Sequence, residues 1–235
     1  TVRHPSHAPT LVAMAYSTPE YHPAFEEYCE TIYELAEDDL NVIQARIADR
    51  LDISRPAVSE MIRRMEKEGL VATDGTVISL TAEGQDLAVS VVRRHRLAER
   101  FLTDMLGLSW TDAHYEAGKW EHVISPLVES ALDKLLGRPT TCPHGNPIPG
   151  SSYEEPDSRH LVEVAVGEGF TVSRITEELE FTEGMLDFLE ESALIPGKRG
   201  TVTAASPDGT VTIEIDGNHL GVGVFAAERI LVTAG

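Results

Sequence analysis

The chain has few of the residues that mark secreted or membrane-spanning proteins. It holds only two cysteines, Cys29 and Cys142, which lie far apart in the sequence. One chain therefore cannot build a disulfide framework or a four-cysteine zinc site. No uninterrupted apolar run approaches the roughly 18 to 20 residues that a membrane helix needs, and residues 11–16 are too few for the apolar core of a signal peptide. These absences predict a soluble, cytoplasmic protein without a membrane partner.

Basic residues are also scarce. The sequence has 19 Lys and Arg against 39 Asp and Glu, which gives a formal net charge of -20. Such a chain would be a poor partner for a polyanion if its charge were spread evenly. Residues 41–100, however, carry ten basic and nine acidic side chains, so this segment is nearly neutral. Because DNA phosphates are bound by local Lys and Arg, the pattern is compatible with DNA binding, and it fits an ordinary solvated helical surface equally well.

The overall composition is that of a globular protein. With 42% hydrophobic and 25% charged residues among 235, the chain is neither disordered nor collagen-like and has room for two or three domains. We expect an α+β multidomain fold. Residues 1–20, with three prolines and with His4 and His7, predict a flexible extension. The remainder divides into a winged helix-turn-helix domain (21–90), a helical domain (91–139), a Pro/Gly linker (140–159) and a small β-barrel (160–235).

The order of elements in the first domain is helix, helix, turn, helix, hairpin. Apolar residues at three- and four-residue spacing predict helices over 23–37, 42–51, 55–68 and 81–101, and a hairpin over 71–80. Ser54 can cap the third helix, and Pro56 can occupy its first turn. Asp74-Gly75 predicts the turn of the hairpin, and Thr81 opens the next helix.

The sequence pattern differs in the rest of the chain. Apolar periodicity predicts one further helix over about 111–137, and the prolines and glycines that follow predict a linker over 140–158. Short alternating segments separated by Gly, Asp and Pro are typical of a small barrel. The predicted strands are 161–166, 200–203, 210–215 and 221–225.

A helix-turn-helix domain places its second helix in the major groove, with the N-terminal residues at the base edges, while the first helix crosses the backbone. The predicted DNA-binding residues are Ser54, Arg55, Pro56, Ala57, Ser59 and Glu60 at the start of the reading helix, and Gln44, Arg46, Arg63 and Arg64 near the phosphates. Few direct base contacts are expected, so specificity for the DNA sequence would depend partly on DNA shape. A winged-helix domain used for protein contacts is the alternative.

Three predicted helical faces carry side chains that bind metals. His95 and Glu99 share one face, and His114, Gly118 and His122 follow at four-residue intervals on the next helix, with Glu121 beside them. Glu27, Glu30 and Glu34 share a face of the first helix. Burying several carboxylates together is costly unless a cation compensates them, and a divalent metal does so directly.

These residues and their context resemble the diphtheria toxin repressor family of metal-dependent transcriptional regulators. The resemblance covers residues 21–235 and is carried by the segments 31–35 (TIYEL), 45–51 (ARIADRL), 94–100 (RHRLAER), 120–123 (WEHV) and 145–150 (GNPIPG). It implies a winged-helix domain, a helical dimerisation and metal domain, and a C-terminal SH3-like, FeoA-like domain. It also implies a homodimer whose bound metal orders the first helix and sets two reading helices for palindromic double-stranded operator DNA. The expected role is repression of metal-homeostasis genes.

The resemblance also implies two metal sites. The ancillary site falls on His95, Glu99, His114, Glu177 and Glu180, and the primary site falls on Glu27, Gly118, Glu121 and His122, with Glu30 as a further candidate ligand. Iron-type members have Met and Cys where this chain has Glu27 and Gly118. Manganese-type members have carboxylates at the positions of Glu27 and Glu30, and also at the position of Gly118. The absence of sulfur favours Mn²⁺ slightly over Fe²⁺, while Zn²⁺ or Co²⁺ could bind in vitro.

The family's anion-binding positions correspond to Arg96, Cys142 and Asn146. Cys142 replaces the family's serine, which puts anion binding in doubt. Cys142 together with His144 is either an extra metal contact or a passive linker thiol. Two other functions remain as alternatives: a winged-helix regulator that senses an oxidant or small molecule through Cys29 or Cys142, with metal only structural, and a metallohydrolase. An enzyme needs an open coordination position and a general base, which the sequence does not offer, so we expect no catalysis and no small-molecule substrate.

Overall fold

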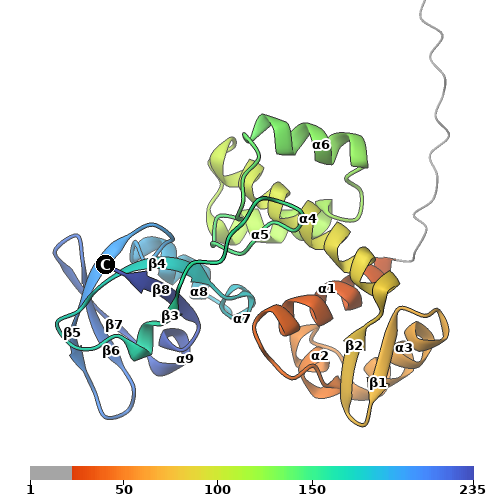
Figure 1. The fold of residues 1–235 in the computed structure, drawn as a ribbon, viewed down its shortest axis with the longest axis horizontal. Helices are drawn as coiled ribbons and strands as arrows, with labels where there is room; N and C mark the ends of the chain where they lie inside the picture. The colour runs from red at the N-terminus through yellow and green to blue at the C-terminus, as the bar shows by residue number, and fades with distance from the viewer. Residues whose placement is uncertain (1–22) are drawn as a thin grey trace, which may run out of the picture.

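The computed structural model describes residues 23–235, so the expected N-terminal extension with His4 and His7 lies outside the described residues. Three groups of elements surround three hydrophobic cores (Figure 1). A winged unit, a helical unit and a C-terminal unit follow one another along the chain. Within residues 23–235, no helix combines the length and apolar character needed to cross a lipid bilayer.

The first unit is a winged helix-turn-helix. It consists of α1 (Pro23–Glu37), α2 (Gln44–Arg50), α3 (Arg55–Lys67), β1 (Val71–Asp74) and β2 (Val77–Leu80). Ser54 caps α3 by accepting a hydrogen bond from the Ala57 amide at 3.4 Å, and Pro56 lies in the first turn, as predicted. The hairpin turn is one residue later than predicted, because Asp74 pairs with Val77 and leaves Gly75 and Thr76 as the loop. Gly75 has φ +61°, a conformation that glycine adopts without strain.

The helical unit contains α4 (Ala82–Asp104), α5 (Trp110–Trp120) and α6 (Pro126–Leu135). The prediction of one helix over 111–137 is wrong, because two helices occupy that range. Ser125 caps α6 through the Val128 amide, and Pro126, which has no N–H to donate to a preceding turn, starts the new helix. Ala98, Ala113 and Ala117 are fully buried between the helices. These small side chains let α4 and α5 pack closely, which brings their polar faces together.

The first half of the predicted linker is part of the protein interior. Cys142, His144 and Asn146 are at most 1% exposed, and the His144 carbonyl accepts a hydrogen bond from Ile175 on the neighbouring strand at 2.8 Å. Gly145 has φ +93°, and a Cβ there would lie 2.3 Å from the Ser173 carbonyl oxygen. The glycines and prolines that predicted a linker thus form, over residues 142–146, a tight loop packed against a sheet, which we call the 142–146 loop.

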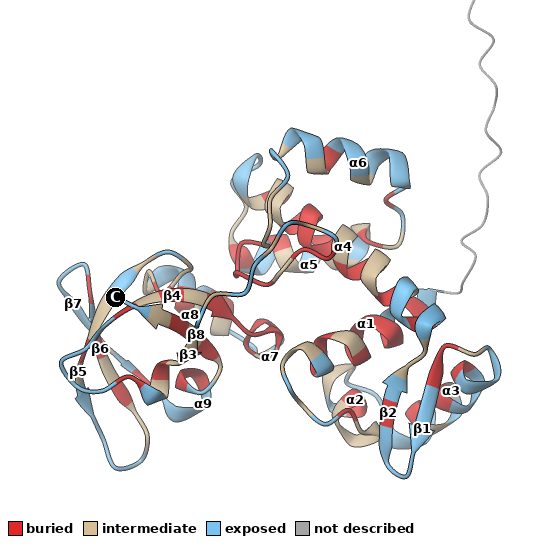
Figure 2. Ribbon diagram, viewed as in Figure 1, coloured by how far each residue is buried: buried red, intermediate tan, exposed pale blue. Residues whose placement is uncertain are grey.

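The C-terminal unit is built on a six-stranded antiparallel sheet with the strand order β3-β8-β4-β5-β6-β7. Its elements are β3 (Arg159–His160), the 3-10 turn η1 (Leu161–Glu163), β4 (Gly169–Ile175), α7 (Glu177–Glu180), α8 (Met185–Glu191), β5 (Arg199–Ala205), β6 (Val211–Ile215), β7 (Asn218–Val222), α9 (Val224–Ala227) and β8 (Ile230–Ala234). Buried residues alternate with less buried ones along β4, β6 and β8, and most of α7 is buried (Figure 2).

Two of the four strand predictions are confirmed, since 200–203 and 210–215 fall on β5 and β6. The prediction for 161–166 is wrong, because Leu161–Glu163 forms a 3-10 turn closed by the Glu163 carboxylate, which accepts from the His160 amide at 3.0 Å. The segment 221–225 straddles the end of β7 and the start of α9. Helix α7 has four residues and no apolar periodicity to reveal it, yet it faces the helical unit and contributes to the site described next.

Candidate metal centre

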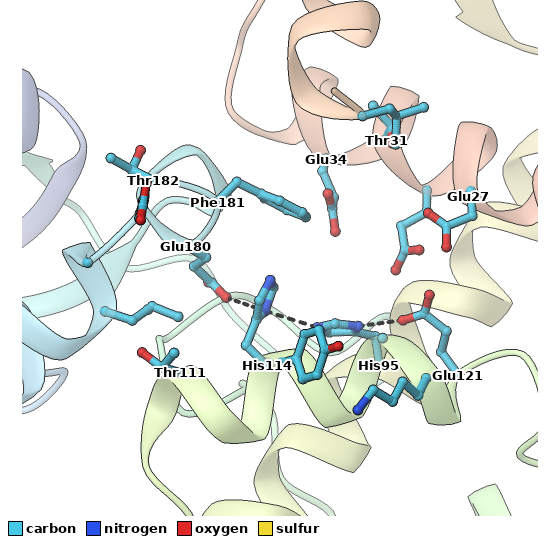
Figure 3. Close-up of a pocket in the computed structure, with 18 residues that line it drawn as sticks. Glu27, Thr31, Glu34, His95, Thr111, His114, Glu121, Glu180, Phe181 and Thr182 are labelled. Atoms are coloured by element: carbon cyan, nitrogen blue, oxygen red, sulfur yellow. Dashed lines mark hydrogen bonds and ion pairs between the residues drawn. The ribbon is translucent and has the colours of Figure 1, made fainter. Parts of the chain in front are cut away.

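Helices α1, α4, α5 and α7 bring acidic and imidazole side chains to the wall of one cavity of about 610 Å³ (Figure 3). Glu27 and Glu34 reach it from α1, His95 from α4, His114 and Glu121 from the α5 region, and Glu180 from α7. The helical faces inferred from sequence spacing therefore do converge. Among the described residues, four groups of potential ligand atoms lie in or beside this cavity, and the two groups that share Glu99 form one cluster.

The first group, which we call the primary cluster, contains Glu27, Glu121 and His122. One potential ligand atom from each lies within 4.8 Å of the others. His122 Nε2 is 3.1 Å from Glu27 Oε1 and 3.1 Å from Glu121 Oε1. Because Glu27 belongs to α1 and the other two follow α5, this cluster links the winged unit to the helical unit.

Glu26 holds the other side of the His122 ring. Its Oε2 is 2.6 Å from His122 Nδ1, and the side chain is buried. A carboxylate in this position selects the tautomer that leaves Nε2 free to bind a metal. Sequence reasoning missed Glu26, although the four-residue spacing of Glu26, Glu30 and Glu34 was a usable signal.

The second group, the central cluster, joins Glu30, His95 and Glu121, and all three are buried. His95 Nδ1 is 2.5 Å from Glu121 Oε2. Glu30 Oε1 has no hydrogen-bond partner within residues 23–235. Burial, together with the nearby Glu121 and Glu34 carboxylates, raises the pKa of Glu30 well above its usual range. A buried carboxylate oxygen without a partner, facing an imidazole and a second carboxylate, fits a divalent cation.

The third group, the ancillary cluster, lies on the other side of His95. His95 Nε2 is 3.2 Å from Glu99 Oε1, and His114 Nδ1 is 2.9 Å from the same oxygen and 3.4 Å from Glu180 Oε2. The two ring nitrogens of His95 thus face different clusters. Nitrogen and oxygen donors of this kind suit Mn²⁺, Fe²⁺, Co²⁺ and Zn²⁺.

The 142–146 loop adds His144 and Cys142 to the ancillary cluster. His144 Nδ1 lies 2.7 Å from Glu180 Oε2 and 3.6 Å from Glu99 Oε1, and Cys142 Sγ lies 3.8 Å from the same nitrogen. Glu99, Cys142 and His144 are all buried and could share one ion. Of the two interpretations that the sequence allowed for this pair, the geometry favours the metal contact over the passive thiol.

Two carboxylates expected near the metals have other partners. Glu177 Oε1 accepts from Arg96 at 2.7 Å, and Glu34 Oε2 accepts from Arg50 at 3.1 Å. Neither residue belongs to a group whose ligand atoms lie within 4.8 Å of one another among the described residues. The structure therefore brings together four of the five predicted ancillary residues, His95, Glu99, His114 and Glu180, without Glu177.

Gly118 lines the cavity but contributes no side chain to it. A Cβ at this position would meet no atom within 4 Å among the described residues. The position is therefore open, and a larger residue would fit there. Glu30 lines the same cavity, and its central cluster shares Glu121 with the primary cluster.

The histidines in these clusters hold protons tightly. Burial alone would lower the pKa of His114, but the hydrogen bonds that its ring donates to Glu180 and Glu99 raise it to about 10. For His122, burial is likewise outweighed by Glu26 and Glu27, and the pKa rises to about 10. Conversely, burial would raise the pKa of Glu99, whereas His144 and His95 hold it well below its usual range. Imidazoles thus compensate the Glu99 carboxylate, whereas the raised pKa of Glu30 indicates a carboxylate that lacks such compensation.

The three predicted anion-binding residues are already paired with protein groups. Arg96 is buried and contacts Glu37 Oε2 at 2.6 Å and Glu177 Oε1 at 2.7 Å. Asn146 donates to Glu180 Oε1 and accepts from Arg174, and Cys142 lies beside His144. Carboxylates therefore stand where an anion would have to bind Arg96, which does not favour an anion site.

The predicted DNA-binding residues lie at the surface of the winged helix-turn-helix. Ser54, Arg55, Pro56 and Ala57 are exposed at the start of α3, together with Glu60, Arg63 and Arg64 further along it. Ser59, Gln44 and Arg46 are half-buried. Arg63 Nε donates to the Ser59 carbonyl at 3.1 Å and Arg46 Nη1 to the Asn41 carbonyl at 2.8 Å, so both side chains are held along the surface of their helices.

Comparison with known proteins assigns each unit. Residues 21–76 match the family described as the iron dependent repressor N-terminal DNA binding domain, residues 81–150 match the iron dependent repressor metal binding and dimerisation domain, and residues 159–234 match the FeoA domain. The chain is 40% identical over 206 residues to the iron-dependent repressor IdeR of Mycobacterium tuberculosis (strain ATCC 25618 / H37Rv), covering 83% of this chain and 89% of the relative.

Two further relatives extend the match. The diphtheria toxin repressor of Corynebacterium diphtheriae (strain ATCC 700971 / NCTC 13129 / Biotype gravis) is 50% identical over 127 residues, which are 53% of this chain and 56% of the relative. A solved structure described as a manganese-dependent transcriptional repressor in complex with manganese superposes with a TM-score of 0.81 at 31% identity and covers 90% of this chain and all of its own. The chain therefore belongs to the iron-dependent and diphtheria toxin repressor family, whose members are metal-dependent DNA-binding transcriptional repressors and not enzymes.

Proposed function

We propose that this repressor responds to Mn²⁺ in preference to Fe²⁺, and that the primary cluster is its sensing site. The observation that carries the metal assignment is the donor set, because Glu27, Glu121 and His122 offer oxygen and nitrogen atoms and no sulfur. Hard, oxygen-rich sites suit Mn²⁺ better than sites with thiolate or thioether ligands. One solved neighbour is described as manganese-dependent and a curated relative as iron-dependent, so the relatives point to different metals. The preference for Mn²⁺ over Fe²⁺ is therefore argued from the donor atoms of this chain.

The residues of the primary cluster explain how metal would control DNA binding. When bound, the cation supplies the positive charge that compensates the carboxylates on both sides of the cavity. Glu27 is 48% exposed in its side chain and lies on α1, whereas Glu121 is buried at the end of α5. Holding these two residues together fixes α1, and with it the winged unit, against the helical unit. Since a ligand shifts an equilibrium only through contacts that differ between two states, Glu27 is the contact that matters most.

We further propose a homodimer formed through α5 and α6. Val123, Leu127 and Val128 are 71%, 81% and 46% exposed, and Leu135 and Leu106 add to the same helical unit. The matched family description names this unit a dimerisation domain, and an exposed apolar surface of this kind suits a second copy of the same chain. Two α3 helices related by a twofold axis would read a palindromic operator. The protein would act in the cytoplasm, and the genes that it represses would be those of metal homeostasis.

The oxidant-sensing alternative is not favoured by the cysteines. Cys29 is fully buried in the core of the winged unit, and burial with the nearby Glu26 raises its pKa to about 12. Burial also raises the pKa of Cys142, with Glu99 and Glu180 adding to the effect. Protonated, buried thiols react slowly with oxidants, so neither residue resembles a redox sensor.

The metal preference is tested by restoring sulfur at the open position. Operator affinity of the wild-type chain is measured against free Mn²⁺ and, anaerobically, free Fe²⁺, and the titrations are repeated with Gly118→Cys and with Gly118→Ala as the matched control. We expect Mn²⁺ to activate the wild type at lower free concentration than Fe²⁺, and Gly118→Cys to shift the ratio toward Fe²⁺ by about tenfold. Activation of the wild type at lower Fe²⁺ than Mn²⁺ would overturn the assignment.

A further inference from the structure

Phe181 lies where the C-terminal unit meets both the ancillary cluster and the DNA-binding unit. It ends the short helix α7 and directly follows Glu180, whose carboxylate contacts His114 and His144. Its side chain projects into the cavity between the units (Figure 3) and is 48% exposed, whereas its neighbours Leu179 and Glu180 are buried. Because the ring is half-exposed and lies beside a buried ionic cluster, it contributes little to a hydrophobic core. Its role must therefore lie in its specific contacts.

The ring touches two helices from different units. The Arg50 guanidinium carbon on α2 lies 4.4 Å from the ring centroid, which is a cation–π contact. On another side, the His114 imidazole on α5 packs edge-on, with ring centroids 5.1 Å apart and an interplanar angle of 87°. Phe181 therefore connects a residue of the ancillary cluster to a residue of the DNA-binding unit.

Arg50 in turn depends on few partners. Its side chain is 5% exposed, and its Nη1 pairs with Glu34 on α1 at 3.1 Å. Its Nη2 has no hydrogen-bond partner in the part of the chain that the structure describes. The face of the ring is thus a substantial part of what stabilises the buried guanidinium, and moving the ring would disturb the pair that joins α2 to α1.

We propose that Phe181 is a positioning residue that couples the ancillary cluster to the DNA-binding unit by holding Arg50 against Glu34. The proposal rests on the metal-dependent function proposed above. Fixing Glu180 and His114 fixes the ring that lies against both of them, and the ring then restrains α2, the helix that precedes the reading helix α3. This route is separate from the one through Glu27, so loss of Phe181 weakens the metal response without abolishing it.

The test separates metal binding from its effect on DNA binding. Phe181→Leu keeps an apolar side chain and removes the aromatic face, while Phe181→Tyr keeps the face. Phe225→Leu is the matched control, because Phe225 lines the same groove as Arg50 and Phe181 but stacks on Arg229, at 4.0 Å, within the C-terminal unit. For each full-length variant, Mn²⁺ affinity is measured by calorimetry, and operator affinity is measured by anisotropy with and without Mn²⁺.

We expect Phe181→Leu to bind Mn²⁺ with nearly wild-type affinity while the Mn²⁺-induced gain in operator affinity falls by about threefold to tenfold, the size of one partly buried cation–π contact. Phe181→Tyr should restore the gain, and Phe225→Leu should leave it unchanged. Hydrogen exchange without DNA gives a second readout, since Mn²⁺ should protect the amides of α2 in the wild type and protect them less in Phe181→Leu.

The possible failures are distinguishable. If the wild type binds its operator equally well with and without Mn²⁺, the proposed function itself fails. If the wild type responds to Mn²⁺ and Phe181→Leu responds equally, the coupling role is wrong. If Phe181→Leu loses Mn²⁺ binding, or if Phe225→Leu loses the same gain in operator affinity, the coupling role is also overturned, because the ring would then act in assembling the site or in general packing.

Discussion

Individual histidines carry protons that a metal must displace. His114 and His122 have pKa values of about 10 because, although burial lowers them, the carboxylates of Glu180 and Glu99 and of Glu26 and Glu27 raise them. Both imidazoles are therefore charged at neutral pH in the metal-free protein. A metal ligand must be a neutral imidazole, so binding and proton release are linked.

Metal affinity should therefore increase with pH. Between pH 6.5 and 8.5 both histidines remain below their raised pKa values, so each proton displaced adds about tenfold in Mn²⁺ affinity per pH unit. Calorimetric titrations at pH 7.5 in buffers of different ionisation enthalpy count the protons released directly. We expect one to two protons per chain, and a value near zero would contradict the assignment of His114 and His122 as ligands.

Glu26 should matter to the metal without binding it. The change Glu26→Gln keeps the shape of the side chain but weakens the hydrogen bond that orients His122, and loss of such an orienting carboxylate typically costs about 10- to 100-fold in metal affinity. Glu116→Gln is the control, since Glu116 is only half-buried on α5 and its one ion pair in the described structure is with Lys119. Competition with a fluorescent chelator measures both variants. Equal Mn²⁺ affinity in Glu26→Gln and the wild type would remove Glu26 from the site.

The 142–146 loop reaches the ancillary cluster because Gly145 packs directly against β4. In Gly145→Ala the new Cβ would collide with the Ser173 backbone, so the loop must move away with His144. We expect a loss of about 3 kcal/mol or more in stability, together with weaker ancillary metal binding. Gly150→Ala is the control, because Gly150 has φ +76° but open space around its Cβ, and should cost only about 1 to 2 kcal/mol.

Chemical denaturation measures both glycine variants, and metal stoichiometry is determined on each. Comparable losses of stability at Gly145 and Gly150 would show that the close approach to β4 has no special cost. An unchanged ancillary site in Gly145→Ala would show that His144 does not depend on the seating of this loop.

Elements with a clear periodic pattern or a cap could be predicted from the sequence, and those defined by tertiary contacts could not. The helices of the winged unit follow from apolar spacing and from Ser54 and Pro56, which act locally. The break before Pro126 was missed because apolar residues continue in helical phase across it. Helix α7 and the buried 142–146 loop show no apolar periodicity in the sequence. Contacts with other parts of the fold hold them in place, and such contacts leave no local pattern.

The same distinction applies to the metal centre. Spacing identified His95, Glu99, His114, Glu121 and His122, because pairs on one helical face are visible in a sequence. The family resemblance, not spacing, placed Glu177 among the ancillary ligands, whereas the structure pairs that carboxylate with Arg96. That pairing depends on a residue 81 positions away, and no local pattern reveals it.

At the scale of the whole molecule, dimerisation determines whether two α3 helices can act on one operator. Leu127 is 81% exposed on α6, and a carboxylate there would have to be desolvated in the proposed interface. Leu127→Glu should therefore weaken the dimer by at least about tenfold, with little effect on the fold of the chain. Val166→Glu is the control, because Val166 is 58% exposed in the C-terminal unit. Sedimentation over a range of concentrations reports the result, and a Leu127→Glu variant as dimeric as the wild type would place the interface elsewhere.

The central claim is that metal held between α1 and α5 controls DNA binding, and operator binding in defined metal tests it most directly. An operator selected from a random library is titrated with chelated and with Mn²⁺-loaded protein, for the wild type and for Glu27→Ala, by fluorescence anisotropy. We predict that Mn²⁺ raises wild-type operator affinity by tenfold or more, about the size of a typical allosteric coupling, and that Glu27→Ala loses most of this gain. Equal affinity of the wild type in chelator and in Mn²⁺ would contradict the account.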